Sequence, residues 1–332
     1  MLYQSDFLQK LEAGLREVLP EWGISPEAKL KLLTISENAT YLVEDSTGRR
    51  LVLRIQRPDY HTRAEIESEL AWIKALRDSR MVTTPEPIAT LAGGSLSCFA
   101  DREAVRYVAA FEHMPGAEPD PGNQLTSWYR VLGETNARLH QHSMTWQRPD
   151  GFKRKVWSFD TIIGEQAYWG DWRNALGLTQ EGREMLERTH ELLRKQTAAF
   201  GMAPERFGLV HCDMRLANLL VDGEQLTVID FDDCGFSWFA YDFAACVSFL
   251  EEDPRVDEFL AAWLEGYRSV APFSAEDERA IPMFLMLRRM QLTAWIASHA
   301  ETPTASSTGA DYTRGTVALA EQYLGNHSEN TL

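Results

Sequence analysis

Four polar side chains occur at a spacing that suits the transfer of a phosphoryl group. His211, Asp213, Arg215 and Asn218 form the pattern H-x-D-x-R-x-x-N, and an Asp-Phe-Asp triplet, residues 230–232, begins twelve residues after Asn218. Phosphoryl transfer from Mg-ATP depends on positioning and charge neutralisation more than on covalent chemistry. A carboxylate must orient the accepting hydroxyl, and oxygen ligands must hold the metal ions that bridge the phosphates. The pattern supplies side chains for both tasks.

Asp and Asn also occur in loops and at helix ends for purely structural reasons, which would explain Asp213 or Asn218 alone. In this chain the polar loop is followed by two short apolar strands, predicted at 219–221 and 226–229, and then by the Asp-Phe-Asp triplet. An ordered pattern of this length favours a chemical role over simple capping.

Residues 207–250 resemble the catalytic core of the kinase-like phosphotransferases. This group includes aminoglycoside phosphotransferases, choline kinases, type II homoserine kinases and stress-response kinases, which share the bilobal protein-kinase fold. The resemblance covers about residues 30–250, and it is closest to the homoserine kinase and stress-response kinase branch. It implies ATP as the phosphate donor and Mg²⁺ as the metal.

The resemblance implies a role for each residue that matches the motif. These roles are catalytic base for Asp213, magnesium ligands for Asn218 and Asp230, support of the catalytic loop for His211, contact with the transferred phosphate for Arg215, and structural anchoring of the loop for Asp242 in the YDFA run.

The match is partial in the N-terminal part, where kinases place a lysine on the third strand to hold the nucleotide phosphates. Arg54 stands at that position and keeps the charge, but as a planar fork instead of a compact ammonium. The lysine normally pairs with a glutamate on the next helix. Glu69 is the expected partner of Arg54, with Glu65 as the runner-up, for which a surface salt bridge is the favoured alternative.

Two further segments are implied to contact ATP. The turn at 36–40, with Ser36 and Asn38, would cover the phosphates, although it lacks the G-x-G-x-x-G glycines and an ordinary hairpin turn is an equal alternative. The backbone at Glu112 and Met114 would bind adenine, and the alternative there is a plain linker.

The elements around these residues predict an α+β, bilobal, protein-kinase-like fold. Alternating apolar residues predict antiparallel strands at 30–35, 39–44 and 50–56, and a further strand at 104–111. Helical periodicity predicts a main helix over 61–80 and mainly helical structure after residue 120, with an exposed loop at 301–309. We therefore expect a nucleotide-binding lobe at 1–111, a hinge at 112–119, and a catalytic and substrate-binding lobe at 120–332.

Composition narrows the function classes further. The chain has 33 Lys and Arg against 49 Asp and Glu, a formal net charge of -16 over 332 residues, which disfavours a general nucleic-acid binder. No apolar run is long enough for a membrane span, and the N-terminal residues lack an export signal. The four cysteines form no CxxC pair. We expect a cytoplasmic protein with no membrane or nucleic-acid partner, and the oligomeric state is left open.

The phosphate acceptor is predicted to be a hydroxyl of a small molecule. Trp157, Trp169 and Trp172 could line its pocket, although aromatic residues more often pack in the core. Asp232, next to the expected metal site, and the net charge of -16 favour an amine-bearing metabolite of homoserine, amino alcohol or aminoglycoside type. The alternatives are a Ser/Thr protein kinase of the stress-response type and a nucleotide-binding pseudokinase.

Overall fold

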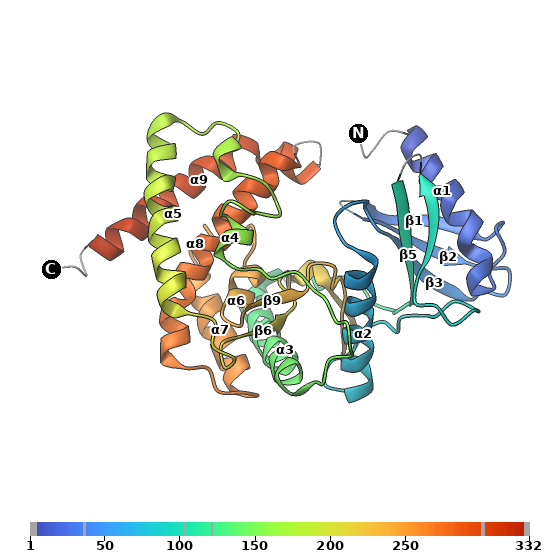
Figure 1. Cartoon of the computed structure of the whole chain (residues 1–332). Coiled ribbons are helices and arrows are strands. Elements are labelled where there is room, and N and C mark those ends of the chain that lie inside the picture. Colours follow the sequence, from blue (N-terminus) through green and yellow to red (C-terminus); the bar gives the residue numbers. More distant parts are fainter. Residues whose placement is uncertain (1–4, 36–37, 102–103, 121, 300–302, 329–332) are drawn as a thin grey trace. The chain divides into compact units, whose positions relative to one another are not determined.

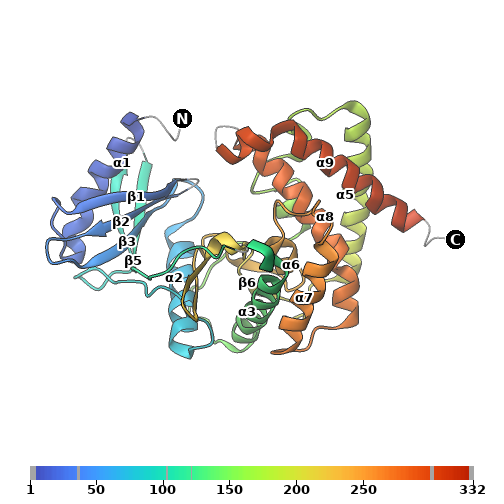
Figure 2. The same ribbon diagram turned by 180° about the vertical axis from the view of Figure 1, so that it is seen from behind.

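An antiparallel sheet of five strands, in the order β1-β2-β3-β5-β4, forms the N-terminal part of the chain. The computed structural model describes residues 5–35, 38–101, 104–120, 122–299 and 303–328 (Figures 1 and 2). In β2, Ala39, Tyr41 and Val43 are buried and alternate with partly exposed residues, so one face of the strand lies in the core. The strands are β1 (Lys29–Ile35), β2 (Ala39–Glu44), β3 (Arg50–Ile55), β4 (Ser97–Asp101) and β5 (Ala104–Glu112).

The strands predicted at 30–35, 39–44, 50–56 and 104–111 are confirmed, whereas β4 was not predicted. Helix α1 (Ser5–Val18) and the 3₁₀ turn Leu19–Trp22 contribute Leu11, Leu15 and Trp22 to the core beneath the sheet. The sheet therefore has its own apolar core, which holds β3 and Arg54 in place.

Helix α2 (Arg63–Ser79) confirms the helix predicted over 61–80. It begins with a capping box, in which the Glu65 N–H donates to Thr62 Oγ1 at 3.3 Å and the Thr62 N–H donates to Glu65 Oε2 at 2.8 Å. Glu69, one turn further along, is completely buried. The two glutamates of the helix thus have different surroundings.

The chain forms two units, and they are interleaved in the sequence. One contains Met1–Pro119, Trp146–Arg154 and Leu219–Asp232, and the other contains Asp120–Thr145, Lys155–Asn218 and Asp233–Leu332. The hairpin of β7 (Leu219–Asp222) and β8 (Gln225–Val228) belongs to the first unit, where the Val228 N–H donates to the Thr83 carbonyl at 2.9 Å. The division into working lobes at 1–111, 112–119 and 120–332 stays a prediction.

The second unit is mainly helical. Its small antiparallel sheet pairs β6 (Phe207–Val210) with β9 (Gly235–Trp238). The helices are α3 (Leu125–Thr145), α4 (Phe159–Ile162), α5 (Gln180–Phe200), α6 (Tyr241–Cys246), α7 (Val256–Arg268), α8 (Ala275–Ser298) and α9 (Pro303–Ser328), with 3₁₀ turns at Gly122–Gln124, Trp172–Asn174 and Leu216–Asn218. The sheet-containing unit and this helical unit confirm the expected α+β class.

Two glycines allow α3 and α7 to pack at backbone distance. A Cβ at Gly133 would lie 2.0 Å from the Trp263 carbonyl oxygen, and a Cβ at Gly266 would lie 1.9 Å from the Arg130 carbonyl oxygen. Neither approach leaves room for a side chain. This contact fixes α3, which supplies two side chains to the site described below.

The C-terminal region departs from the sequence prediction. Residues 303–308 are helical, so the loop expected at 301–309 is wrong there, and α9 kinks at Gly309, which has φ 37°. Small polar residues are only a weak indication of a loop, because the helix propensities of individual residues other than proline differ by less than about 1 kcal/mol.

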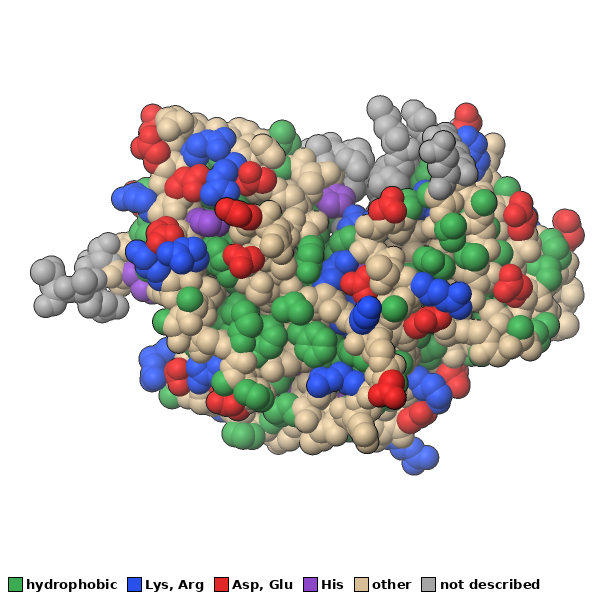
Figure 3. Space-filling view, in the orientation of Figure 1, with side chains coloured by type: hydrophobic (Ala, Val, Ile, Leu, Met, Phe, Trp, Pro, Cys, Tyr) green, Lys and Arg blue, Asp and Glu red, His purple; other side chains and the backbone are tan. Residues whose placement is uncertain are grey.

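Among the described helices, none is both long enough and apolar enough to cross a bilayer. Acidic and basic side chains are interspersed over the visible face of the molecule (Figure 3).

Candidate active site

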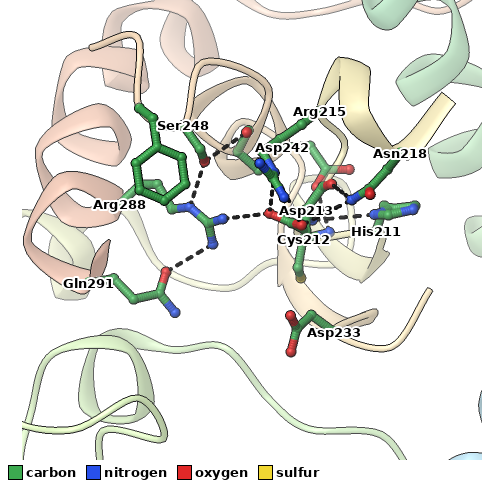
Figure 4. Close-up of polar contacts among 12 residues, drawn as sticks. His211, Cys212, Asp213, Arg215, Asn218, Asp233, Asp242, Ser248, Arg288 and Gln291 are labelled. Carbon is green, nitrogen blue, oxygen red and sulfur yellow. Dashed lines mark hydrogen bonds and ion pairs between the residues drawn. The ribbon is translucent and has the colours of Figure 1, made fainter. Parts of the chain in front are cut away.

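The loop that follows β6 carries the H-x-D-x-R-x-x-N pattern and is held by hydrogen bonds among its own residues (Figure 4). The Asp213 N–H donates to Nδ1 of the buried His211 at 3.3 Å. Asn218 Nδ2 donates to the Asp213 carbonyl at 2.7 Å and to Asp213 Oδ2 at 3.0 Å. Cys212 has φ 66°, a left-handed conformation that is costly for a residue other than glycine. The loop therefore needs external support.

Asp242, the second residue of α6, gives that support. Its Oδ1 accepts a hydrogen bond from the Cys212 N–H at 2.9 Å. Its Oδ2 accepts from Asn136 Nδ2 at 3.0 Å and faces His140 Nε2 at 2.9 Å, both from α3. The carboxylate is completely buried, so three partners offset the cost of removing its charge from water.

Arg288, in the middle of α8, is a site residue that the sequence analysis missed. Its Nη2 donates to Asp213 Oδ1 at 2.8 Å, although 75 residues separate the two (Figure 4). Its Nε donates to Ser248 Oγ at 3.0 Å, and its Nη1 donates to Tyr241 Oη and to Gln291 Oε1, each at 3.2 Å. The guanidinium is almost completely buried and is fixed by these partners.

The signal for Arg288 in the sequence is weak. It is one of two adjacent arginines in the apolar run 283–292, and a charged pair in such a run suggests buried ion pairs. Its neighbour Arg289 does not bind Asp213; its guanidinium donates to Glu251 Oε2 at 2.9 Å and to Glu252 Oε2 at 2.7 Å. Only the fold distinguishes the two arginines.

The charges around Asp213 keep its carboxylate ionised. Burial raises the pKa of Asp213, but the positive charges of Arg215 and Arg288 outweigh burial, so the pKa is lowered overall. Arg215 Nε lies 3.3 Å from the carboxylate. Each carboxylate oxygen therefore has at least one donor, which fixes the plane of the group.

In the first unit, Arg54 pairs with Glu69. Arg54 Nη2 donates to both Glu69 carboxylate oxygens at 2.7 Å, and both side chains are buried. Burial lowers the pKa of Arg54, yet the carboxylates around it raise the pKa overall, so the guanidinium stays charged. Glu65, the runner-up, is committed to the helix cap.

Two carboxylates from the Asp-Phe-Asp triplet lie beside Arg54. Asp230 Oδ1 is 3.8 Å from Nη1, and Asp232 Oδ1 is 3.8 Å from Nη2. The Asp230 side chain is 52% exposed, whereas that of Asp232 is 6% exposed and also faces His61 Nε2 at 3.6 Å. Burial raises the pKa of Asp232, but the interactions with His61 and Arg54 lower it by a larger amount. The pKa is therefore lowered overall, and the carboxylate stays ionised.

These contacts give Asp232 a place in a buried ion-pair cluster, which does not favour the substrate-pocket role expected from the sequence. Arg154, which is distant in the sequence, also contacts this cluster. Its guanidinium donates to the Glu65 carbonyl at 2.9 Å and to the Asp232 carbonyl. Asp230 is the member of the triplet whose carboxylate remains accessible.

The remaining nucleotide candidates lie at the ends of two inner strands of the sheet, Asn38 directly before β2 and Glu112 and Met114 at the end of β5 and just after it. Asn38 Oδ1 accepts from the Arg57 N–H at 3.0 Å, and Ser36 lies outside the described residues. The Glu112 N–H donates to the Glu86 carbonyl at 2.8 Å, and its side chain pairs with Arg77 at 2.7 Å. Met114 is half-buried just beyond β5. Their contacts with ATP stay predictions.

The three tryptophans expected to line the substrate pocket are all buried in the core. Trp157 and Trp172 are buried, and Trp157 Nε1 donates to the Asp233 carbonyl at 2.9 Å. Trp169 is 5% exposed; its ring contacts that of Trp157, and the Arg288 guanidinium lies 5.0 Å from its centroid. Trp169 is thus the tryptophan of the three that is connected to Asp213, through Arg288.

Asn218 of the second unit and Asp230 of the first each carry an oxygen donor of the kind that magnesium prefers. Asn218 uses its amide nitrogen on Asp213, which leaves its oxygen as a neutral ligand. Asp230 offers an accessible carboxylate. Mg²⁺ prefers such oxygen ligands, with few from protein and others from phosphate and water.

Comparisons with known proteins place the chain in a family. The model of the phosphotransferase enzyme family matches residues 31–277. A solved structure of a microcompartment-associated aminopropanol kinase is 41% identical with a TM-score of 0.87, and the match covers 94% of this chain and 97% of that one. A solved amicoumacin kinase, in complex with AMP-PNP and Ca²⁺, is 21% identical with a TM-score of 0.76 over 95% of this chain and 94% of that one. A homoserine kinase of Gluconobacter oxydans is 27% identical over 256 residues, 74% of each chain.

Proposed function

The chain belongs to the phosphotransferase enzyme family and is a kinase, and we propose that it transfers the γ-phosphoryl group of ATP to a hydroxyl of a small amine-bearing metabolite. The observation that carries the proposal is the Asp213 carboxylate, which is ionised and held by Arg288, Arg215 and Asn218. A fixed carboxylate of this kind is what the accepting hydroxyl needs.

In the proposed reaction, the hydroxyl oxygen of the acceptor forms a bond to the γ-phosphorus and the bond from that phosphorus to the β–γ bridging oxygen breaks, which releases ADP. Asp213 takes the hydroxyl proton. Because its pKa is lowered, the carboxylate is a weak base that orients the hydroxyl first and receives the proton as the new bond forms. His211 and Asp242 act on the loop that carries it.

ATP and magnesium have distinct residues in this proposal. Asn218 and Asp230 would hold magnesium, which supplies charge neutralisation when bound. Arg54 and Arg215 would neutralise phosphate oxygens, with Glu69 holding Arg54. The turn at Ser36 and Asn38 would cover the phosphates, and the backbone near Glu112 and Met114 would bind adenine. Because the reaction would use ATP as the phosphate donor, a cytoplasmic location of the protein is part of the proposal.

Two observations support an amino alcohol or a hydroxy amino acid as the acceptor. The chain is similar over nearly its whole length to an aminopropanol kinase, and it is also similar to a homoserine kinase. The formal net charge of -16 favours the approach of a cationic amine over that of an anion.

A coupled assay of ADP release tests the proposal. Amino alcohols, hydroxy amino acids, sugars and aminoglycosides are offered one at a time with MgATP, and Asp213→Asn serves as the inactive control. We expect turnover with a member of the first two groups. Turnover with none of the four, combined with phosphate incorporation into protein, would contradict the proposal and favour a protein kinase.

A further inference from the structure

The guanidinium of Arg54 is hydrogen-bonded to protein along one edge only. Nη2 binds both oxygens of Glu69 at 2.7 Å. Nη1 makes no hydrogen bond to any of the described residues, and it pairs with Asp230 Oδ1 only at 3.8 Å. Arginine has five N–H donors in a rigid plane, so fixing one edge determines where the other edge points.

Gln56 completes the occupied edge. It follows β3 directly, is 2% exposed, and its own N–H donates to the Tyr107 carbonyl at 2.9 Å. With its amide oxygen toward the guanidinium, that oxygen accepts from Arg54 Nη2 and Nε, each at 2.9 Å. Glu69 and Gln56 together therefore engage Nη2 and Nε, and both N–H groups of Nη1 are left over.

The other end of the same amide binds two more side chains. In this orientation Gln56 Nε2 donates to Asp232 Oδ1 at 3.1 Å and to Asn38 Oδ1 at 3.2 Å. One buried side chain thus connects Arg54, the carboxylate of Asp232 and the turn after β1. The amide has both an acceptor and a donor end, so an apolar residue of equal size could make none of these bonds.

We propose that Gln56 is a positioning residue for nucleotide phosphate: it fixes the plane of Arg54 so that Nη1 is presented to the polyphosphate of ATP. This inference rests on the proposed function, because it concerns the ATP that the kinase would bind. In this arrangement the planar guanidinium of Arg54 replaces the compact ammonium of the lysine found in related kinases. Glu69 and Gln56 together fix the plane of the guanidinium, which an ammonium does not require.

The test measures how much the phosphates contribute to nucleotide binding. Isothermal titration calorimetry gives the Kd values of ATP and adenosine, each with excess MgCl₂, for the wild type and for Gln56→Leu. We expect the ratio Kd(adenosine)/Kd(ATP) to fall about tenfold in the variant, which equals about 1.4 kcal/mol, while the Kd of adenosine stays within about twofold. A loss confined to the phosphates distinguishes positioning from general loosening of the fold.

Two further variants keep the result interpretable. Thr84→Val is the matched control: it removes another buried polar bond of the same unit, from Thr84 Oγ1 to the Ile73 carbonyl at 3.1 Å, and should leave the ratio unchanged. Gln56→Met, unbranched like glutamine, replaces Gln56→Leu if that variant fails to fold.

The outcomes separate the inference from the proposed function. A folded Gln56 variant with the wild-type ratio overturns the role of Gln56 and leaves the kinase proposal intact. Wild-type protein that binds ATP no more tightly than adenosine overturns the proposed function and the inference with it.

Discussion

Arg288 Nη2 lies 2.8 Å from Asp213 Oδ1, and this ion pair connects the middle of α8 to the loop after β6. Arg288 is 2% exposed, so the pair is shielded from water and salt. The same guanidinium also binds Ser248, Tyr241 and Gln291, which prevents it from following Asp213 if the carboxylate moves. Arg288 therefore positions Asp213.

Replacing Arg288 by methionine should lower kcat roughly 100-fold, or about 2.7 kcal/mol of barrier, because Asp213 loses the donor that fixes Oδ1. The KM for ATP should change little. Steady-state kinetics on the preferred acceptor measures both. Arg289→Met is the matched control, since it removes an adjacent buried arginine whose partners are Glu251 and Glu252. Equal loss of kcat in both variants would show that the effect is merely structural.

Asp242→Asn should destabilise the fold and slow the reaction together. An amide has one acceptor oxygen, whereas Asp242 serves Cys212, Asn136 and His140 through two. We expect the free energy of unfolding to fall by about 2–4 kcal/mol, measured by urea titration. The kcat should also fall, because the strained backbone at Cys212 loses its anchor. Wild-type stability in this variant would contradict the anchoring role.

Gly133→Ala should destabilise the second unit by more than about 2 kcal/mol, because its Cβ would lie 2.0 Å from the backbone of Trp263. Gly325→Ala in α9 is the matched control: a Cβ there meets nothing within 4 Å, so alanine should raise stability by up to about 1 kcal/mol. Thermal unfolding of both variants checks the opposite signs. A stable Gly133→Ala protein would mean that α3 and α7 pack less closely than described.

His190 should make the stability depend on pH. Burial, and next the charge of Arg173, lower the pKa of His190 below 6.5 in the folded state. The unfolded chain then binds a proton more readily, so the stabilisation is complete above pH 6.5 and is lost as the pH falls below that value. Urea unfolding at pH 7 and pH 5 should show a smaller difference for His190→Gln than for the wild type. An equal difference in the two proteins would contradict this role of His190.

The family resemblance read from the polar loop and the Asp-Phe-Asp triplet is confirmed by the family match over residues 31–277. The strands of the meander and helix α2 were also predictable, because alternation and helical periodicity are local properties. A capping-box signal, T-x-x-E at residues 62–65, was present as well and would have assigned Glu65 to the start of α2.

The partners of the charged residues were predictable only in part. Glu69 was expected beside Arg54, since both matched positions of a known pair. Gln56 was not, because no spacing rule connects the end of a strand to a carboxylate in the Asp-Phe-Asp triplet. Asp232 illustrates the same limit: its place next to the expected metal ligand Asp230 suggested a substrate contact, which stays a prediction, and its burial against Arg54 and His61 could not be read from the sequence.

The class of chemistry and the local elements can be read from the chain alone, because the catalytic loop, its hairpin and the strands are each specified by residues close together in the sequence. Which charges meet depends instead on the packing of distant elements. Arg288 and Arg289 are adjacent and chemically identical, yet α8 turns one toward Asp213 and the other toward Glu251. Adjacent residues on a helix face different directions, and the neighbours they meet depend on how distant elements pack.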